Sequence, residues 1–333
     1  MTINEYFALL DVPQDSQLAR NIIRNNVSDN DIMRYWTQSG MTVVGQDLPM
    51  KDLSIYRARF DNKKWEDKTD ISQFGYIKER CKIKMCRYNR DKEQVFYAST
   101  SFDAAFKESL PNVIPDYVYI SKWRKNDETR LKVQLNLCEQ PSDTSEVVRS
   151  YLLTMKQQLD TNVFKRANQV GQILEAEEIE GYDKLNYKFS SMAASIIFRE
   201  ADVLLTRSKK CPDYLNLTLK KEAADKLKLE SVYKCRCNGI KGLCFPVEEI
   251  GIPVNNKIEW HKYKTCIKRI QNIVPLYCGY PLKPYGMERV EAQSMKAEYE
   301  LSPNINQPLD ELHLGIIKCG NYKVTVQFSV ELE

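Results

Sequence analysis

The chain has 333 residues, of which 43% are hydrophobic and 28% are charged. This balance is typical of a globular protein and excludes a disordered one, and the length allows one large domain or two modest ones. The 49 basic and 45 acidic residues leave a formal net charge of only +4, spread along the chain, which argues against binding to nucleic acid or to a membrane surface.

No apolar run approaches the roughly 18 residues that a membrane-spanning helix needs. The first residues, MTINEYFALLDVPQDSQ, lack a basic segment followed by an apolar stretch. We therefore expect a cytoplasmic protein that spans no membrane. The ten cysteines are then expected to be reduced thiols rather than a disulfide framework.

The cysteines and histidines are also candidates for metal ligands or for a catalytic nucleophile. Cys235, Cys237 and Cys244 occur together in KCRCNGIKGLC, and Cys81 and Cys86 form a second, loose pair. Structural zinc sites usually combine two well-spaced pairs, often with histidines, and this chain has two histidines in all. We expect no metal site. The scarcity of histidine also argues against a Ser-His or Cys-His nucleophile, and the phosphate-binding motifs GxGxxG and GxxxxGK[ST] are absent from the sequence.

The first half of the chain alternates between helical and strand-like patterns. Residues 1–45 read as helical, with a turn at NNVSDND. The stretch LSIYRARF alternates and predicts a strand that places Tyr56 on one face and Arg57 on the other. VFYAS predicts a further strand, and Thr100 with Asp103 predicts a capping box for the helix that follows it.

That helix carries one acid, Glu108, in its second turn. Phe102, Ala105 and Phe106 recur at helical spacing and are expected to face a core, which leaves Glu108 on the flank of that face. A boundary position of this kind suits the wall of a cleft, and it also suits an ordinary solvated acid.

The remainder of the chain continues the mixture of helices and strands. VYISKWRK and LKVQLNL predict strands, and residues 144–177 predict a hairpin of two helices. A helix (SSMAASIIFREA), a strand (DVLLTRS), a loop (KKCPDY) and the stretch LNLTLKKEAADKLK follow. Beyond residue 230 strands dominate: SVYKCRC, GLCFPVEEI and the alternating YKVTVQFSVELE. We expect an α+β fold with largely antiparallel sheets and flanking helices.

Five of these elements occur in an order that resembles the RES domain family, named for its Arg, Glu and Ser. They are SIYRAR, CRYN, VFYASTSFDAAFKE, LLTRSKKCPDYLN and LTLKKE, and they cover residues 51–230. Cys86 stands where the family has glycine, and Thr206-Arg207 stands where it has Tyr-Pro. An alternative alignment places Cys235, in VYKC, at the late serine position; we prefer Ser208, because the asparagine and LTLKKEA that follow it are then also in register.

The resemblance implies an ADP-ribosyltransferase-like fold that binds NAD+ and cleaves the bond between nicotinamide and ribose. NAD+ would be the substrate, and no cofactor is implied. Residues 46–230 would form this NAD+-binding catalytic core, with a helical segment at 1–45 and a strand-rich extension at 231–333. RES toxins deplete cellular NAD+ and are usually paired with an antitoxin that covers the cleft, so we expect any antitoxin or inhibitor to be a separate chain. The two extensions could gate the cleft, sense a trigger or make a homo-oligomer.

The resemblance also gives individual residues a role. Cleavage of the glycosidic bond develops positive charge on the ribose, so a carboxylate near the ribose should accelerate it, and Glu108 is the candidate. Arg57 would pair with the pyrophosphate or fix the substrate, and Arg87 is a second candidate for phosphate contact. Taken alone, an arginine in an alternating strand is more often a surface ion-pairing residue.

The other matched residues would complete the site. Tyr97 could stack on the cationic nicotinamide ring, although a tyrosine in an apolar strand is more often a core residue. Ser208 would hydrogen-bond the substrate amide or phosphate, and Asn216 would support that loop. Tyr56, beside Arg57 in the signature, is interpreted mainly as packing.

Three functions stay open at this point. The first is an NAD+ glycohydrolase or phosphorylase that acts as a toxin or defence effector. The second is an ADP-ribosyltransferase that uses the same cleft but transfers ADP-ribose to a macromolecule. The third is a catalytically silent binding protein that keeps the fold. The acceptor, whether water, phosphate or protein, separates the first two.

Overall fold

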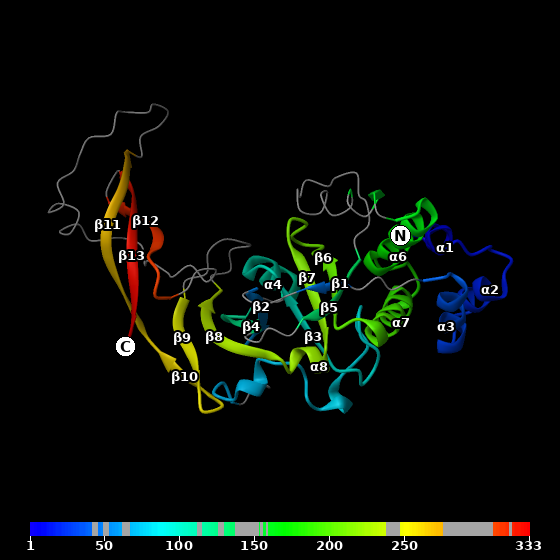
Figure 1. The fold of residues 1–333 in the computed structure, drawn as a ribbon, viewed down its shortest axis with the longest axis horizontal. Helices are drawn as coiled ribbons and strands as arrows, with labels where there is room; N and C mark the ends of the chain where they lie inside the picture. Colours follow the sequence, from blue (N-terminus) through cyan, green and yellow to red (C-terminus); the bar gives the residue numbers. More distant parts are fainter. Residues whose placement is uncertain are drawn as a thin grey trace. The chain divides into compact units, whose positions relative to one another are not determined.

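A computed structural model gives the fold of this chain (Figure 1). The residues that it describes are 1–41, 46–48, 53–61, 67–111, 115–125, 130–136, 153, 156–157, 159–237, 247–275, 309–319 and 322–333. They belong to two compact units, each assembled from three separate stretches of chain. The first unit contains Met1–Arg57, Ser72–Glu108 and Trp123–Lys228, and the second contains Ala58–Ile71, Ser109–Lys122 and Leu229–Glu333.

The expected segments 1–45, 46–230 and 231–333 follow one another along the chain, whereas the compact units are each discontinuous. That division stays a prediction. Within the described part of the chain, no helix is both long enough and apolar enough to cross a membrane.

The helices of the first unit include three that precede the first strand. The helices are α1 (Ile3–Leu10), α2 (Gln17–Ile23), α3 (Asp29–Gln38), α4 (Phe102–Ser109), α6 (Thr161–Glu175), α7 (Leu185–Glu200) and α8 (Lys221–Ala224), with short 3-10 turns at Ile71–Gln73 and Arg80–Lys82. The prediction of a helical N-terminal region is confirmed. Of the predicted helical hairpin at 144–177, α6 forms the second part, and most of the first part lies outside the described residues.

A shared apolar core explains why these helices associate. α1 and α3 pack against α6 and α7 (Figure 1), and the buried side chains at their contact include Tyr6, Trp36 and Phe189. The Trp36 indole Nε1 donates a hydrogen bond to the Phe189 carbonyl at 3.0 Å, so its one polar atom is satisfied inside the core. The N-terminal helices are therefore part of the first unit's core.

The strands of the first unit form a sheet in the order β1-β5-β6-β7-β3-β2. Their bounds are Gln46–Leu48 (β1), Ile55–Phe60 (β2), Val95–Ser99 (β3), Leu131–Asn136 (β5), Val203–Arg207 (β6) and Leu215–Lys220 (β7). β5 and β6 are parallel, whereas β1 with β5, β2 with β3, β3 with β7 and β6 with β7 are antiparallel. Asn216 on β7 pairs with both Ser99 on β3 and Thr206 on β6, so these three side chains share one face.

The second unit is rich in strands, as predicted for the end of the chain. Its strands are β4 (Tyr117–Lys125), β8 (Leu227–Arg236), β9 (Val247–Val254), β10 (Lys257–His261), β11 (Tyr263–Pro275), β12 (His313–Cys319) and β13 (Tyr322–Leu332). β11, β13 and β12 form an antiparallel three-stranded sheet. The predicted alternation of β13 holds at Val324, Val326 and Phe328, which are buried, whereas Leu332 near its end is 41% exposed. The chain therefore has the expected α+β fold with mostly antiparallel strands.

Candidate functional site

The connection from β6 to β7 holds Ser208 in one position. The Ser208 N–H donates to the Tyr214 carbonyl at 3.0 Å, and the Tyr214 N–H donates to the Cys211 carbonyl at 2.9 Å. The Cys211 N–H in turn donates to the Ser208 hydroxyl at 3.0 Å. Because a serine that accepts from a backbone N–H three residues on stabilises a turn, the loop orients its own side chain. Ser208 is completely buried.

Glu108, on α4, receives three hydrogen bonds from this connection and from β7. Its Oε1 accepts from the Ser208 hydroxyl at 2.6 Å and from the Asn216 amide Nδ2 at 3.1 Å. The Lys210 N–H donates to the same oxygen at 3.2 Å. The structure thus brings three of the predicted site residues into direct contact, although the two ends of this contact lie about a hundred residues apart in the chain. We refer to Glu108, Ser208 and Asn216 as the carboxylate cluster.

The helix that carries Glu108 is fixed to β7 at its beginning. Thr100 was expected to cap this helix together with Asp103, and that prediction is wrong, because α4 begins at Phe102, one residue too late for Thr100 to be its N-cap. The Thr100 hydroxyl instead donates to the Leu215 carbonyl and accepts from the Leu215 N–H, each at 3.3 Å. This contact ties the beginning of α4 to the strand that carries Asn216.

The environment of Glu108 favours its charged form. Partial burial of the carboxyl raises its pKa, whereas the hydrogen bonds from Ser208 and Asn216 lower it. The backbone N–H groups of Lys209 and Lys210 act in the same direction, so the net effect holds the pKa of Glu108 below its ordinary value. The carboxylate is therefore ionised at neutral pH while partly withdrawn from water.

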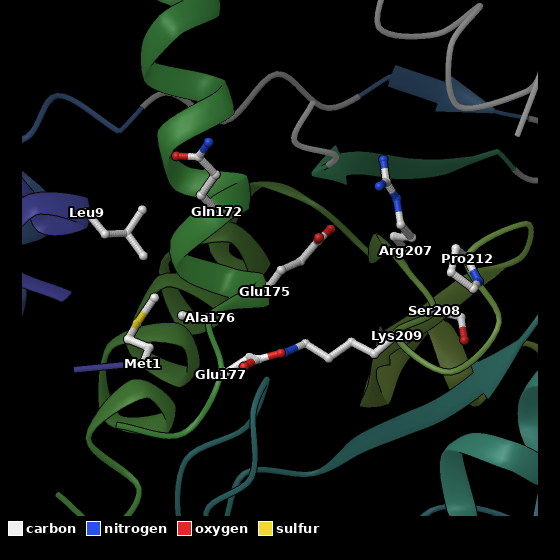
Figure 2. A pocket seen from close by; sticks show the side chains of 10 residues that line it. All are labelled: Met1, Leu9, Gln172, Glu175, Ala176, Glu177, Arg207, Ser208, Lys209 and Pro212. Carbon is white, nitrogen blue, oxygen red and sulfur yellow. The ribbon is translucent and has the colours of Figure 1, made fainter. Parts of the chain in front are cut away.

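A cavity of about 460 Å³ adjoins the carboxylate cluster at Ser208 (Figure 2). The residues that line it come from the beginning of the chain, the end of α6 and the β6–β7 connection. They are Met1, Leu9, Gln172, Glu175, Ala176, Glu177, Arg207, Ser208, Lys209 and Pro212. Its volume lies within the usual range for small-molecule sites.

Four charged residues of this wall were not predicted from the sequence. Figure 2 shows Glu175 between α6 and Arg207, and Lys209 extended across the cavity toward Glu177. Burial and the positive charge of Arg87 lower the pKa of Lys209 to about 8, against the opposing effect of nearby carboxylates. The only local signals were the basic run TRSKK beside Ser208 and the acidic run EAEE; nothing in the sequence indicated that they would meet.

Arg87 holds the end of α6, which forms one wall of the cavity. Its Nη1 donates to the carbonyls of Leu174 and Ala176 at 2.9 and 3.1 Å, and its guanidinium lies 5.4 Å from the centre of the Tyr187 ring. The last carbonyls of a helix lack partners within the helix, and a cation there also interacts favourably with the helix dipole. The contacts of Arg87 are thus those of a helix-capping residue, and its contact with phosphate stays a prediction.

Tyr97 is held by the CRYN loop. Its hydroxyl donates to Asn89 Oδ1 at 2.9 Å and accepts from the Tyr88 N–H at 3.0 Å. Burial raises the pKa of Tyr88 to about 12, consistent with a closely packed pair of rings whose centres are 6.3 Å apart. The second and third elements of the resemblance are therefore neighbours in space. Stacking of Tyr97 on nicotinamide stays a prediction.

Arg57 lies on the other face of the sheet from the Tyr97 ring. Its Nη1 donates to the Tyr97 carbonyl at 2.7 Å, and its guanidinium lies 5.2 Å from the centre of the Phe96 ring. Phe96 and Tyr97 are consecutive residues of β3, so their side chains point to opposite faces. Tyr56, next to Arg57, is 2% exposed and pairs with Ser99. The roles of Arg57 and Tyr56 toward a substrate stay predictions.

Cys235, the alternative to Ser208, lies on β8 in the second unit and is fully buried. Burial raises the pKa of its thiol, which disfavours the reactive thiolate. Among the described residues, no group of three or more His, Cys, Asp and Glu side chains could hold a metal ion, and Cys244 lies outside them.

Comparison with known proteins gave one structural match. No protein-family model matches the chain, and no curated protein matches it. Among solved structures, it is similar to a chain in the crystal structure of the M. tuberculosis MbcT-MbcA toxin-antitoxin complex, with 11% identity and a TM-score of 0.29 over 62% of this chain and 91% of that chain. A likeness at this level carries no argument about fold or function, so the proposals below depend on the residues.

Proposed function

We propose that this protein cleaves NAD+ at the bond between nicotinamide and ribose, on an ADP-ribosyltransferase-like fold. The observation that carries the proposal is the carboxylate cluster: Ser208, Asn216 and a backbone N–H converge on one oxygen of Glu108 beside a cavity. The order of the family's motifs adds support, because the two segments that carry Glu108 and Ser208 are far apart in sequence and meet in space.

The chemistry needs a fixed negative charge. As the bond to nicotinamide breaks, the ribose carbon becomes positively charged, and a carboxylate that is already oriented stabilises that charge without reorganising. The hydrogen bonds from Ser208, Asn216 and the Lys210 N–H reach Oε1 of Glu108. We assign Oε2 to the substrate. Attack by water then gives ADP-ribose, nicotinamide and a proton, and attack by inorganic phosphate gives nicotinamide and a phosphorylated ADP-ribose.

The remaining predicted residues are assigned supporting roles. Arg87 would bind the pyrophosphate, as a permanently charged planar group suited to phosphate oxygens. Arg57, on the other face of the sheet from the Tyr97 ring, would fix the substrate by holding the strand that carries Tyr97. Tyr97 would offer a ring face to nicotinamide, which is cationic before cleavage. Ser208 and Asn216 would orient Glu108, and Ser208 would also hydrogen-bond the substrate amide or phosphate.

Depletion of NAD+ would make the protein a toxin or defence effector in the cytoplasm. Such an activity requires control, and we propose a separate antitoxin that binds over the cleft. A complex in which the partner leaves both Arg57 and Glu108 open to solvent would contradict this part of the proposal.

The test is nicotinamide release from NAD+ by the purified full-length chain. The reaction is followed by chromatography, with and without phosphate and cell extract, for the natural protein, Glu108→Gln and Glu108→Ala. Glu222→Gln is the matched control, because Glu222 is an exposed acid on α8. Release that is lost in both Glu108 variants and kept in the control supports the proposal, and the identity of the ribose product names the acceptor.

Two alternatives remain as outcomes of the same experiment. ADP-ribose attached to a protein of the extract would identify an ADP-ribosyltransferase. Absence of release under every condition would favour a catalytically silent binding protein, and one observation already favours that alternative: Arg57 and Arg87 both donate hydrogen bonds to backbone carbonyls.

A further inference from the structure

The cavity is lined in part by Lys209, an exposed lysine whose amine is surrounded by other charged groups. Lys209 follows Ser208 directly, and its side chain crosses the cavity toward Glu177 (Figure 2). The charged groups that act on its amine come from every surrounding element: Arg87 from the CRYN loop, Glu175 at the end of α6, Glu177 beyond it and Glu108 on α4.

The balance of these groups keeps a neutral amine available. Partial burial of the amine and the nearby Arg87 hold the pKa of Lys209 at about 8, although the three carboxylates oppose them. At pH 7.5 about one quarter of the Lys209 amines would be neutral, against on the order of one in a thousand for a lysine with an ordinary pKa. A neutral lysine amine is a nucleophile toward carbonyl carbon.

The cavity wall supplies the other groups that imine formation needs. Arg207, the residue before Ser208, lines the same cavity and is a permanent cation suited to phosphate or carboxylate oxygens. Glu177, toward which the amine points, is a carboxyl group able to take and return a proton. The cavity therefore combines a nucleophile, an anion-binding group and a proton carrier.

We propose that Lys209 is a carbonyl-binding residue, and that this cavity takes aldehydes or ketones which carry a phosphate or carboxylate group held by Arg207. This activity is independent of NAD+ cleavage. The Lys209 amine attacks the carbonyl carbon, the carbonyl oxygen takes a proton, and the nitrogen loses one to give a carbinolamine. Water then leaves as the C=N bond forms. Amine and aldehyde thus give an imine and one water, with no oxidant or reductant required.

The test uses pyridoxal 5′-phosphate, a phosphorylated aldehyde, as the probe. The full-length chain is incubated with it, reduced with borohydride and digested, and labelling at each lysine is quantified by mass spectrometry. Lys210 is the internal control, because it is exposed like Lys209 and lies one residue away, but does not line the cavity. We expect Lys209 to be labelled at least about tenfold more than Lys210 at pH 7.5, and its labelling to rise through pH 8.

Two variants test which lysine reacts, and a second probe tests whether the phosphate group contributes to binding. Lys209→Arg should abolish the dominant labelled peptide, and Lys210→Arg should leave it. Pyridoxal, which lacks the phosphate, should label Lys209 several-fold less. Equal labelling of Lys209 and Lys210 would overturn the proposal, and equal labelling of Lys209 by the two probes would overturn the part that assigns an anion to Arg207.

Discussion

Glu108 and Arg57 are both charged residues with a role in the proposed chemistry, and their surroundings in the first unit differ. Around Glu108, two side chains and a backbone N–H donate to a single carboxylate oxygen. At Arg57, the guanidinium donates to the Tyr97 carbonyl and lies over the Phe96 ring. The first arrangement is typical of a carboxylate whose negative charge is held in a fixed position. The second is typical of an arginine that stabilises the pairing of two strands.

Substitution of the two residues should therefore have different consequences. Removing a charge that is oriented for a reaction reduces catalysis more than stability, whereas removing a cation that holds backbone and ring reduces stability at least as much.

The largest effect is expected from Glu108→Gln on nicotinamide release. Glutamine keeps the size of the side chain but carries no charge, so the positive ribose carbon loses its stabilising partner. We expect kcat to fall by about 100-fold to 1,000-fold with little change in KM, because the lost interaction belongs mainly to the transition state. Steady-state kinetics checks this, and a kcat within tenfold of the natural protein would remove Glu108 from the chemistry.

Arg57→Lys should have a smaller effect on activity and a measurable effect on stability. Lysine keeps the charge but not the planar fork, so it would not both donate to the Tyr97 carbonyl and lie over Phe96. We expect unfolding by urea to become easier by about 1–2 kcal/mol and KM for NAD+ to rise by about tenfold. Arg80→Lys, at an exposed position, should change stability by less than about 0.5 kcal/mol. Unchanged stability in Arg57→Lys would contradict its anchoring role.

Local sequence patterns predicted where Glu108 and Arg57 lie on their helix and strand. Helical spacing at Phe102, Ala105 and Phe106 was enough to place Glu108 at the flank of a buried face. The predicted strands VFYAS, VYISKWRK, LKVQLNL and DVLLTRS are present. Alternation likewise placed Tyr56 and Arg57 on opposite faces of β2. These features depend on residues only a few positions apart, for which the helical or strand periodicity of apolar side chains is informative by itself.

What the sequence could not give depends on long-range packing. Arg87 caps α6 through carbonyls 87 and 89 residues away, and backbone carbonyls leave no trace in a sequence. Glu175 and Glu177 face Lys209 only because α6 ends beside the β6–β7 connection. The predicted capping role of Thr100 was wrong for the same reason, because its hydrogen-bond partner, Leu215, lies 115 residues further along the chain. Ser208 was found through the order of motifs rather than through any local property.

A double-mutant cycle should show that the carboxylate cluster acts as a unit. Ser208→Ala leaves Glu108 with one donor fewer, and Glu108→Gln weakens the hydrogen bond that Ser208 donates. We expect a coupling of about 1–2 kcal/mol in the free energy of unfolding, because a charge-assisted hydrogen bond is shared by the pair. Additive effects would mean that the 2.6 Å contact contributes little.

Acid should reduce the stability contributed by Glu108. The pKa of Glu108 is lower in the folded protein than in the unfolded chain, where it takes its ordinary value. The stabilisation is therefore fully present at pH values above the unfolded-state pKa, and it is lost as the pH falls through the folded-state pKa. The difference in unfolding free energy between the natural protein and Glu108→Gln should therefore shrink between neutral pH and about pH 3. Urea titrations at several pH values measure it, and a pH-independent difference would contradict the cause given for the lowered pKa.

The smallest expected effect distinguishes the ring of Tyr97 from its hydroxyl. Tyr97→Phe keeps the ring and removes the hydrogen bonds to Asn89 and to the Tyr88 N–H. Stability should fall by about 1 kcal/mol, because Asn89, which is 2% exposed, and the Tyr88 N–H each lose a partner. KM for NAD+ should stay within twofold if only the ring face contacts nicotinamide, whereas Tyr97→Leu should raise it. If Tyr97→Phe raised KM as much as Tyr97→Leu, the hydroxyl would be the group that matters, and stacking would not explain the role of Tyr97.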